Sequence, residues 1–410
     1  MLSRQRRAFS SNFPYVRHLP VASLTLVSLF AAPHPLWVGP QPAKMPSRAS
    51  CVSMRSGRIH VAPMMGYTDA CFRYMMRLLS SDLVLWTEMI TATELVYKAR
   101  EGDLQHVEQK LRLSDVHLEP PTVLQLGGSN PEILAEAVEL AIPYGYDEIN
   151  LNCGCPGRNV RRGKLHSAPK KLRYFSLDNT HESCGAALMR EPECVRDCIG
   201  AMGEVASQAD IPVSIKCRIG VHETVSDMKQ HGDSYEDFVE FVDVVASSGY
   251  ADRFHVHART AIMQGLDTEA NREVPPLRHD YVRHLARDRP NLELTLNGGI
   301  RSLEEAAPYL EEGLDVMVGR WAAAEPWELR SETNRDTSRQ TALHDYMQWA
   351  EQELQRDDVL ADKRTELLAR LTMPIEALYS GMTHTSACRQ AVHKLKRLSI
   401  HEKKAFRKKQ

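Results

Sequence analysis

Short apolar runs recur along the chain, and each is followed by a stretch whose apolar residues return at helical spacing. Runs of this length, bounded by polar residues or glycine, are typical of buried strands. Eight such runs occur, at residues 58–62, 83–88, 122–126, 148–152, 212–216, 254–257, 293–297 and 316–319. Helical patterns between them include residues 131–144, 191–205, 235–247 and 302–310, the last opened by the capping-box pair Ser302 and Glu305.

The alternation of strands and helices predicts the fold class. Eight strands that alternate with helices over about 265 residues are what an α/β fold of the (β/α)8 TIM barrel type requires. An open doubly wound sheet is the competitor, but no GxGxxG motif follows the first strand. We therefore expect a barrel at residues 56–330.

The carboxyl-terminal part of the chain has a different pattern. Residues 335–405 show no strand signals. A charged helical pattern covers residues 343–371, Pro374 is expected to end it, and a basic helix is expected from about Thr385. This pattern predicts a small all-helical domain after the barrel.

The amino-terminal segment has the composition of a targeting leader. The first 68 residues contain no Asp or Glu and carry eight Lys or Arg, with many serines. Arg/Ser-rich, acid-free leaders are typical of organellar transit peptides. We expect residues 1–55 to be such a leader, plastid or mitochondrial, with a disordered tail as the alternative. No run of 18 apolar residues occurs, so no membrane span and no stable membrane association is expected.

Charge is distributed unevenly along the rest of the chain. Residues 1–58 hold eight of the 51 Lys/Arg and none of the 53 Asp/Glu, which leaves 43 against 53 and a net charge of −10 for the remainder. Residues 386–410 nevertheless hold nine Lys/Arg and one acid, Glu402. A polyanionic partner is therefore expected at this tail, unless the tail is only a solvated helix end.

The cysteines do not form a disulfide or zinc pattern. There are nine of them, scattered and without paired CxxC motifs, which favours free thiols. Cys153 and Cys155 stand one residue apart after the fourth strand, but no second ligand pair lies at usable spacing, so no metal site is expected.

Residues at the ends of the predicted strands suggest a cofactor. Asn297, Gly298 and Gly299 follow the seventh strand, and Gly319 and Arg320 follow the eighth, where barrels bind phosphate. Lys216 and Gln125 would offer a cation and an amide to a planar ring that bears carbonyls. Together these groups suggest flavin mononucleotide (FMN).

Each of these features also has a plain structural interpretation. Lys216 could face solvent, His257 could be a core histidine, and Met64 and Met65 could be packing residues. The Asn-Gly-Gly sequence alone is a common turn signal. The coincidence of polar and glycine residues at eight successive strand ends favours the functional interpretation.

The motifs at these strand ends resemble the flavin-dependent tRNA-dihydrouridine synthases, most closely the A type. The resemblance covers residues 59–329 and rests on A-P-M-x-x-x-T-D, T-E-M, L-Q-L-G-G, Y-D-E-I-N-L-N-x-G-C-P, C-G-A-A-L-M, K-x-R-I-G, H-A-R, N-R-E-x-P-P-L, N-G-G-I and M-V-G-R. The helical region is similar to that family's tRNA-binding domain, but more weakly. The resemblance implies reduction of uridine in the tRNA D-loop, near position 20, with NADPH (or NADH) as reductant.

The resemblance also implies roles for individual residues. The FMN-binding residues would be Pro63, Met64, Met65, Gln125, Lys216, His257, Asn297, Gly298, Gly299, Gly319 and Arg320. The tRNA-contacting residues would be Asn152, Arg259, Asn271, Arg272, Glu273, Arg389 and Lys394, with Arg158, Arg161 and Arg218 as further phosphate contacts. A monomer is the default expectation.

Cys155 is the implied general acid. Reduction of the uracil 5,6 double bond needs a hydride at C6 and a proton at C5. A thiol with an ordinary pKa of about 8.5 stays protonated near neutral pH and can still release its proton. Pro156 would stiffen the loop that carries the thiol, and Cys153 is expected to be core filler. The uridine would have to be extruded from the RNA to reach this site.

The chain departs from the family pattern at residues 164–183. This extra stretch falls in the loop that follows Cys155 and carries four Lys/Arg with Tyr174 and Phe175. It could contact RNA, or it could be a retained intron or mis-predicted exon. Two other functions stay open. One is an FMN barrel acting on a small molecule, of the dihydroorotate or enoate type, which would use the same phosphate site. The other is an RNA-binding relative that the extra stretch has made inactive.

Overall fold

The structure is a computed structural model that describes residues 57–113, 121–157, 184–331, 338–356, 364–382 and 386–407, with side chains up to residue 397. These residues belong to one compact unit within Ser53–Gln410. The predicted leader at residues 1–55, the stretch at 164–183, Arg158 and Arg161 lie outside the described residues.

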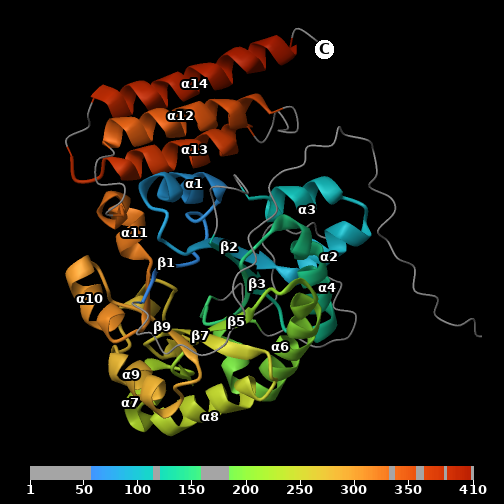
Figure 1. Cartoon of the computed structure of the whole chain (residues 1–410), viewed down its shortest axis with the longest axis vertical. Coiled ribbons are helices and arrows are strands. Elements are labelled where there is room, and N and C mark those ends of the chain that lie inside the picture. Colours follow the sequence, from blue (N-terminus) through green and yellow to red (C-terminus); the bar gives the residue numbers. More distant parts are fainter. Residues whose placement is uncertain are drawn as a thin grey trace, which may run out of the picture. The chain divides into compact units, whose positions relative to one another are not determined.

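A parallel sheet forms the centre of the described structure, and its strands curve into a barrel (Figure 1). The strands are β1 (Ile59–Val61), β2 (Leu85–Thr91), β3 (Thr122–Gly127), β4 (Glu148–Cys153), β5 (Val213–Arg218), β7 (Ala251–His257), β9 (Glu293–Asn297) and β10 (Asp315–Val318). Their order in the sheet is β1-β10-β9-β7-β5-β4-β3-β2. The sheet closes because Val61 N donates to Val84 O (2.9 Å) and Val84 N donates to Ile59 O (2.9 Å). All eight predicted strands and the (β/α)8 architecture are thus confirmed.

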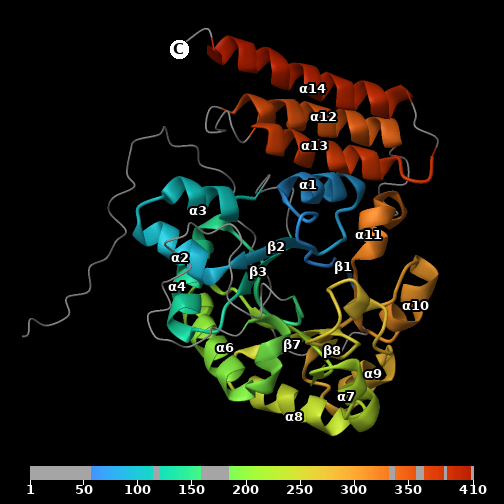
Figure 2. The ribbon, with the colours of Figure 1, turned by 180° about the vertical axis from the view of Figure 1, so that it is seen from behind.

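Helices surround the strands, as Figures 1 and 2 show from opposite sides. They are α1 (Ala70–Leu79), α2 (Ala92–Arg100), α3 (Leu104–Leu111), α4 (Pro131–Ala141), α6 (Pro192–Ala206), α7 (Val225–His231), α8 (Tyr235–Ala246), α9 (His279–Asp288), α10 (Leu303–Glu311) and α11 (Arg320–Ala324). Short 3-10 turns are η2 (Ile142–Tyr144), η4 (Gly185–Arg190), η5 (Ser207–Ala209), η6 (Ala270–Arg272) and η7 (Pro326–Leu329). Strands β6 (Val221–His222) and β8 (Ala261–Ile262) pair separately. The predicted cap of α10 is present, since Ser302 Oγ accepts from Glu305 N at 3.1 Å.

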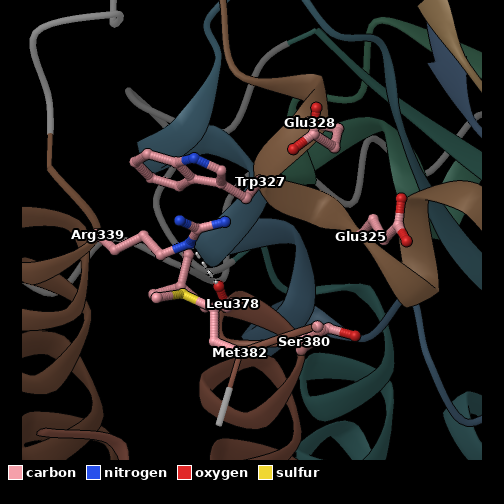
Figure 3. A pocket seen from close by; sticks show the side chains of 9 residues that line it. Glu325, Trp327, Glu328, Arg339, Leu378, Ser380 and Met382 are labelled. Atoms are coloured by element: carbon pink, nitrogen blue, oxygen red, sulfur yellow. Dashed lines mark hydrogen bonds between the residues drawn. The ribbon is translucent and has the colours of Figure 1, made fainter. Parts of the chain in front are cut away.

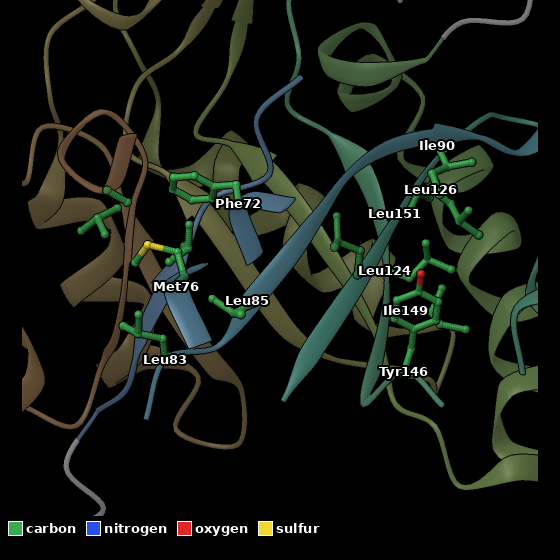
Figure 4. Close-up of a cluster of buried hydrophobic side chains, with 14 of the residues drawn as sticks. Phe72, Met76, Leu83, Leu85, Ile90, Leu124, Leu126, Tyr146, Ile149 and Leu151 are labelled. Carbon is green, nitrogen blue, oxygen red and sulfur yellow. The ribbon is translucent and has the colours of Figure 1, made fainter. Parts of the chain in front are cut away.

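The main apolar core lies between the strands and the surrounding helices. Figure 4 shows Leu124 and Leu126 of β3 with Ile149 and Leu151 of β4 in this cluster. Because side chains alternate along a strand, the residues between them face the opposite side, the barrel interior. There the chain places Gln125 and its polar neighbours beside a second, smaller apolar cluster that includes Trp86, Val123 and Met317. The outer face of the strands therefore stabilises the fold, and the inner face is available for polar contacts.

Three helices follow the barrel: α12 (Arg339–Gln355), α13 (Arg364–Leu378) and α14 (Ser386–Arg407). They pack on one another, and α12 and α13 also pack on α1 of the barrel (Figure 1). Tyr74 of α1 stacks on Trp349 of α12, with ring centroids 4.3 Å apart. The predicted helical region is thus present as a bundle attached to the barrel.

The expected helix break at Pro374 is wrong. Pro374 lies inside α13 and is buried there with Leu371, Ile375 and Leu378. A proline inside a helix removes one hydrogen bond and costs about 3 kcal/mol. Burial of this apolar face between helices offsets that cost, which a local rule about proline does not consider. The single pattern at 343–371 also divides into α12 and α13.

Candidate active site

Strand β4 ends in the two cysteines, and the structure separates their environments. Cys153 is fully buried in the apolar core, and burial, with neighbouring thiols, raises its pKa well above the usual value. Cys155, two residues later, is partly exposed. Cys153 is therefore packing material, as predicted, and Cys155 is the accessible thiol of the pair.

The loop around Cys155 is held by one amide side chain. Asn152 Oδ1 accepts from Gly154 N at 3.0 Å and from Cys155 N at 3.1 Å. On the other side of the loop, Ala186 N donates to Cys155 O at 2.9 Å. These bonds fix the backbone that carries the thiol, so the position of Cys155 depends on the orientation of the Asn152 amide.

Lys216, at the end of β5, lies close to the end of β9. Its Nζ donates to Asn297 Oδ1 at 3.1 Å, and Asn297 Nδ2 donates to Met317 O at 2.7 Å. Burial, together with repulsion from Arg218, lowers the pKa of Lys216 to about 8. Lys216 is therefore a cation near neutral pH and becomes a neutral amine in mildly alkaline solution.

His257 ends β7 in a strongly positive environment. Burial lowers its pKa well below the ordinary value, and Arg218, Lys216, Arg259 and Arg272 lower it further. The imidazole is accordingly neutral at physiological pH. A neutral ring among cations leaves the net charge of this end of the barrel positive, which favours an anionic ligand.

The glycines after β9 have backbone conformations that only glycine adopts readily. Gly298 has a φ of +116° and Gly299 a φ of +80°. A Cβ atom on Gly298 would stand 2.7 Å from His257 Cδ2, and one on Gly299 would stand 2.5 Å from Leu277 Cδ1. The turn therefore requires glycine at both positions, as a loop that approaches a ligand with its backbone does.

Arg320, which follows β10, forms an ion pair that the sequence did not suggest. Its guanidinium bonds to Glu273 Oε1, and Arg301 lies 3.6 Å from the same oxygen. The structure thus joins a predicted phosphate-binding residue, Arg320, to a predicted substrate residue, Glu273. Any phosphate at Arg320 would compete with this carboxylate.

The position of Arg218 contradicts the expectation from the sequence that it contacts an RNA phosphate. It is buried, and its guanidinium donates to the carbonyl oxygens of Gly154 (3.0 Å), Thr260 (2.9 Å) and Asn271 (3.0 Å). A side chain that is buried and bonded to three loops cannot contact an RNA phosphate. Arg218 instead holds the Cys155 loop against the loops that follow β7.

Two other predicted tRNA contacts are already engaged within the protein. Asn271 is fully buried; its amide accepts from Ile262 N at 2.7 Å and donates to Ile262 O at 2.9 Å. Arg259 is buried and donates to the carbonyls of Glu273 and Pro275. Their geometry indicates that both shape the loop that presents Glu273, and a tRNA contact by either stays a prediction.

The remaining predicted residues divide into two groups. Pro63 and Met64 are partly buried and Met65 is 68% exposed, all on the loop after β1, and Arg272 is exposed at the end of η6. Gly319 lies beside Met64, because a Cβ there would be 3.4 Å from its Sδ. Arg389 and Lys394 lie on α14 in the helical bundle, where Lys394 pairs with Glu351. The structure therefore does not bring the α14 residues to the strand ends.

A cavity of about 260 Å³ lies elsewhere, between η7, α12 and the end of α13 (Figure 3). Trp327 lines it, with the guanidinium of Arg339 4.6 Å from the ring centroid. Arg339 Nε donates to Leu378 O at 3.1 Å. None of the residues predicted for the site lines this cavity, so it is separate from the site at the strand ends.

The polar groups at the strand ends fit a flavin. Lys216 supplies an ammonium, Gln125 and Asn152 supply amide N–H groups, and the Gly298–Gly299 turn supplies closely approachable backbone. Donors of this kind match the carbonyl oxygens and ring nitrogens of an isoalloxazine, and the positive end of the barrel matches a phosphate. Within the part of the chain that the structure describes, no cluster of His, Cys, Asp or Glu has the geometry of a metal site. No helix among the described residues is long and apolar enough to cross a membrane.

Comparisons with known proteins identify similar chains. The tRNA-dihydrouridine(20/20a) synthase of Xylella fastidiosa is 42% identical over 270 residues, which is 66% of this chain and 68% of that one. The enzyme of the same name from Vibrio vulnificus is 40% identical over 276 residues, 67% of this chain and 72% of that one. The Synechocystis enzyme of this name is 37% identical over 318 residues, 76% of this chain and 83% of that one.

Similarity to solved structures is weaker. The old yellow enzyme homologue from Zymomonas mobilis (NCR) has 12% identity and a TM-score of 0.38, over 66% of this chain and 86% of that one. A likeness at that level carries no functional argument. The dihydrouridine synthase family model, by contrast, matches residues 60–168 and 177–409, and leaves out only residues 169–176 between them, inside the predicted extra stretch. Because this match spans both the barrel that carries Cys155 and the helices after it, the chain belongs to the dihydrouridine synthase family, whose members are flavin-dependent oxidoreductases.

Proposed function

We propose that this chain is a tRNA-dihydrouridine synthase of the 20/20a type, with FMN as its flavin and NADPH as its reductant. The observation that carries the proposal is the position of Cys155. It is a partly exposed thiol at a strand end, beside Lys216 and Arg218, on a loop that Asn152 and Arg218 hold in place. The names of the three relatives support the substrate and the reaction.

The proposed chemistry divides between the cofactor and the protein. Reduced FMN, when bound, supplies the hydride that uracil C6 receives. Cys155 Sγ would donate the proton that C5 receives, as a general acid on the loop after β4. The bonds from Asn152 to the loop keep the thiol in one position, so that little reorganisation is needed when the substrate arrives.

The residues proposed to bind FMN lie at the strand ends and on the loops that follow them. Lys216, Gln125 and His257 would contact the flavin ring, while Asn297, Gly298, Gly299, Gly319 and Arg320 would contact the ribityl phosphate. The positive end of the barrel supports this assignment. Arg320 would then exchange part of its bonding with Glu273 for the phosphate. Pro63, Met64 and Met65, on the loop after β1, would cover the ring.

The helices after the barrel are proposed to bind tRNA. Arg389, Lys396 and Arg397 are exposed on α14 and would contact phosphates. Such contacts release counterions, so tRNA affinity should fall steeply with salt. With the tRNA body held there, a uridine extruded from an RNA loop could reach the strand ends of the barrel. Bases in RNA loops are the least costly to unstack. The domain limits 56–330 and 335–405 belong to this proposal, as do a monomeric state and organellar targeting by residues 1–55.

The proposal is tested by dihydrouridine formation on an unmodified tRNA with FMN and NADPH. Wild type should turn over, and Cys155→Ala should lose at least about 100-fold in rate, because a general acid contributes about that much. FMN content of the variant should stay unchanged. The matched control is Cys194→Ala, which removes another partly exposed thiol and should keep full activity.

Two outcomes would contradict the proposal. If wild type oxidises NADPH but forms no dihydrouridine on any tRNA, the chain is not a synthase, and a small-molecule substrate becomes the better hypothesis. If wild type binds tRNA but retains no flavin, an inactive RNA-binding protein is favoured. A fluorescent fusion of residues 1–55 tests the targeting proposal separately, since a diffuse cytosolic signal would exclude it.

A further inference from the structure

A continuous series of hydrogen bonds between side chains, the hydrogen-bond chain, runs through the barrel interior to the Cys155 loop. Ser214 Oγ donates to Glu148 Oε1 at 2.5 Å, and Asn150 Nδ2 donates to Ser214 Oγ at 2.8 Å. Gln125 Nε2 donates to Asn150 Oδ1 at 2.9 Å, and Asn152 Nδ2 donates to Gln125 Oε1 at 2.9 Å. All five residues are buried. Every link points the same way, towards Glu148.

The hydrogen-bond chain ends at the carboxylate of Glu148, which fixes its direction. Burial alone would raise the pKa of Glu148, but His255, Arg253 and Ser214 together outweigh it and lower the pKa to about 2. An ionised carboxylate only accepts hydrogen bonds. Ser214 must therefore donate its single proton to Glu148, which leaves the Ser214 oxygen to accept from Asn150.

The other end of the chain is anchored by the backbone. The N–H groups of Gly154 and Cys155 can only donate, and both point at Asn152 Oδ1. This oxygen accepts two bonds and is saturated, so Asn152 can present only its Nδ2 to Gln125. The two ends thus specify the same direction for every amide between them.

The amide of Asn150 could also be placed the other way round. Its oxygen would then accept from Ser214 Oγ at 2.8 Å and from Lys216 N at 3.2 Å. That arrangement requires the one Ser214 proton to serve both Asn150 and Glu148. It also sets the Asn150 NH2 group against the NH2 group of Gln125, unless Gln125 and then Asn152 reverse too, which would turn the Asn152 NH2 group towards two backbone donors. The orientation anchored by Glu148 therefore satisfies the donors and acceptors at both ends of the hydrogen-bond chain, although it sets Asn150 Oδ1 3.3 Å from Leu151 O and Asn150 Nδ2 3.2 Å from Lys216 N.

We infer that Glu148 and Ser214 are positioning residues, which act through this hydrogen-bond chain to set the amide orientations of Gln125 and Asn152 and thereby the position of the Cys155 loop. The inference rests on the proposed function for its catalytic meaning. Neither residue reaches the thiol itself. Their effect is transmitted by four amide and hydroxyl contacts over the interior faces of β3, β4 and β5.

The hydrogen-bond chain also determines which donors and acceptors the site presents to a ligand. Among the described residues, Asn152 Oδ1 already accepts two hydrogen bonds, and the second N–H of Asn152 Nδ2 and of Gln125 Nε2 has no acceptor. Two N–H donors beside the Lys216 ammonium match carbonyl oxygens of a pyrimidine or isoalloxazine ring. A reversed chain would present acceptors instead, which would repel those carbonyls.

The competing explanation is that Glu148 only neutralises its basic neighbours. Arg253 lies 3.0 Å from Glu148 Oε2, and His255 Nε2 lies 2.9 Å from Oε1. Ser214→Ala separates the two explanations, because it interrupts the chain and keeps both of these contacts. Ser214→Thr restores the hydroxyl. The matched control is Thr295→Val, which deletes a buried hydroxyl that bonds His255 Nδ1 at 2.9 Å, outside the chain.

The experiment measures iodoacetamide alkylation of Cys155 in the full-length protein carrying its flavin, by peptide mass spectrometry, with Cys194 as internal reference. Ser214→Ala should accelerate alkylation of Cys155 about fivefold and weaken FMN binding by a similar factor, the effect of about one lost hydrogen bond. Ser214→Thr should return both values towards wild type. Thr295→Val should change neither, even where its melting temperature falls as much as that of Ser214→Ala.

Two results would overturn the inference: alkylation and FMN affinity of Ser214→Ala equal to wild type, or equal effects of Ser214→Ala and Thr295→Val. Neither readout needs turnover on RNA. If the wild type fails to make dihydrouridine, the proposed function fails while the alkylation comparison still decides whether the chain positions the loop.

Discussion

Replacing Arg218 by methionine should destabilise the protein strongly, although the residue was expected from the sequence to face RNA. Its guanidinium donates to the carbonyls of Gly154, Thr260 and Asn271 and is buried. Methionine has similar length but cannot donate, so three buried acceptors would lose a charged donor. At about 1 kcal/mol for each bond, the free energy of unfolding should fall by about 3 kcal/mol.

Burial lowers the pKa of Arg218 to about 10, so the side chain stays charged at neutral pH and the bonds to the carbonyls are charge-assisted. The assay is urea unfolding of the holoprotein, followed by far-ultraviolet circular dichroism at pH 7. The matched control is Arg190→Met, which breaks an exposed ion pair with Glu223 and should cost less than about 1 kcal/mol.

A second measurement addresses the discarded RNA role. The salt dependence of tRNA binding should keep its slope in Arg218→Met, provided the variant is folded, whereas Arg389→Gln should reduce the slope by about one. The reasoning would be refuted if Arg218→Met and Arg190→Met had the same stability. It would also be refuted if the salt slope fell in Arg218→Met as it does in Arg389→Gln.

Three further predictions concern charge at and beneath the site. The folded protein lowers the pKa of Lys216 to about 8, so above that pH the folded state binds fewer protons than the unfolded state. The free energy of unfolding should therefore rise from about pH 8 towards the ordinary lysine pKa of 10.5. Lys216→Met should abolish that rise in urea titrations at several pH values. The pKa of Glu148 is lowered to about 2, so its contribution to the free energy of unfolding should be fully present above its ordinary pKa of 4.5 and be lost as pH falls towards 2. Glu148→Gln should flatten the acidic part of the stability–pH curve, and an unchanged curve would contradict the assignment. Glu273→Gln should free Arg320 and tighten FMN binding about threefold in fluorescence titrations, whereas weaker binding would show that Glu273 supports the site.

Much of the fold could be predicted from the sequence because it depends on local periodicity. The strand at Glu148-Ile149-Asn150-Leu151-Asn152 was expected from its apolar run. The same five residues also alternate polar with apolar, and this was the available signal for a polar barrel interior. It was missed because the run was interpreted only as a buried strand. Pro374 shows the opposite error, since a local rule predicted a break that helix packing overrides.

The candidate site was predictable only in part. The glycines at 298 and 299 follow from backbone conformation, and Cys155 from its motif after a strand end. By contrast, the sequence did not predict that Arg218, Arg259 and Asn271 bond to neighbouring loops. A positively charged or amide side chain near a strand end is equally consistent with ligand binding and with bonding to neighbouring loops, until the loops are in place.

The sequence by itself determined the order of strands and helices, the turns that only glycine can form and the thiol that stands at a strand end, because each depends on a few consecutive residues. The tertiary structure decided which side chains meet. Arg320 reaches Glu273 across 47 positions of the chain, and Arg218 reaches Gly154 across 64. It also decided the direction of the Glu148 hydrogen-bond chain. Such contacts exist only after the sheet closes into a barrel, since closure brings the carboxyl ends of distant strands to one place.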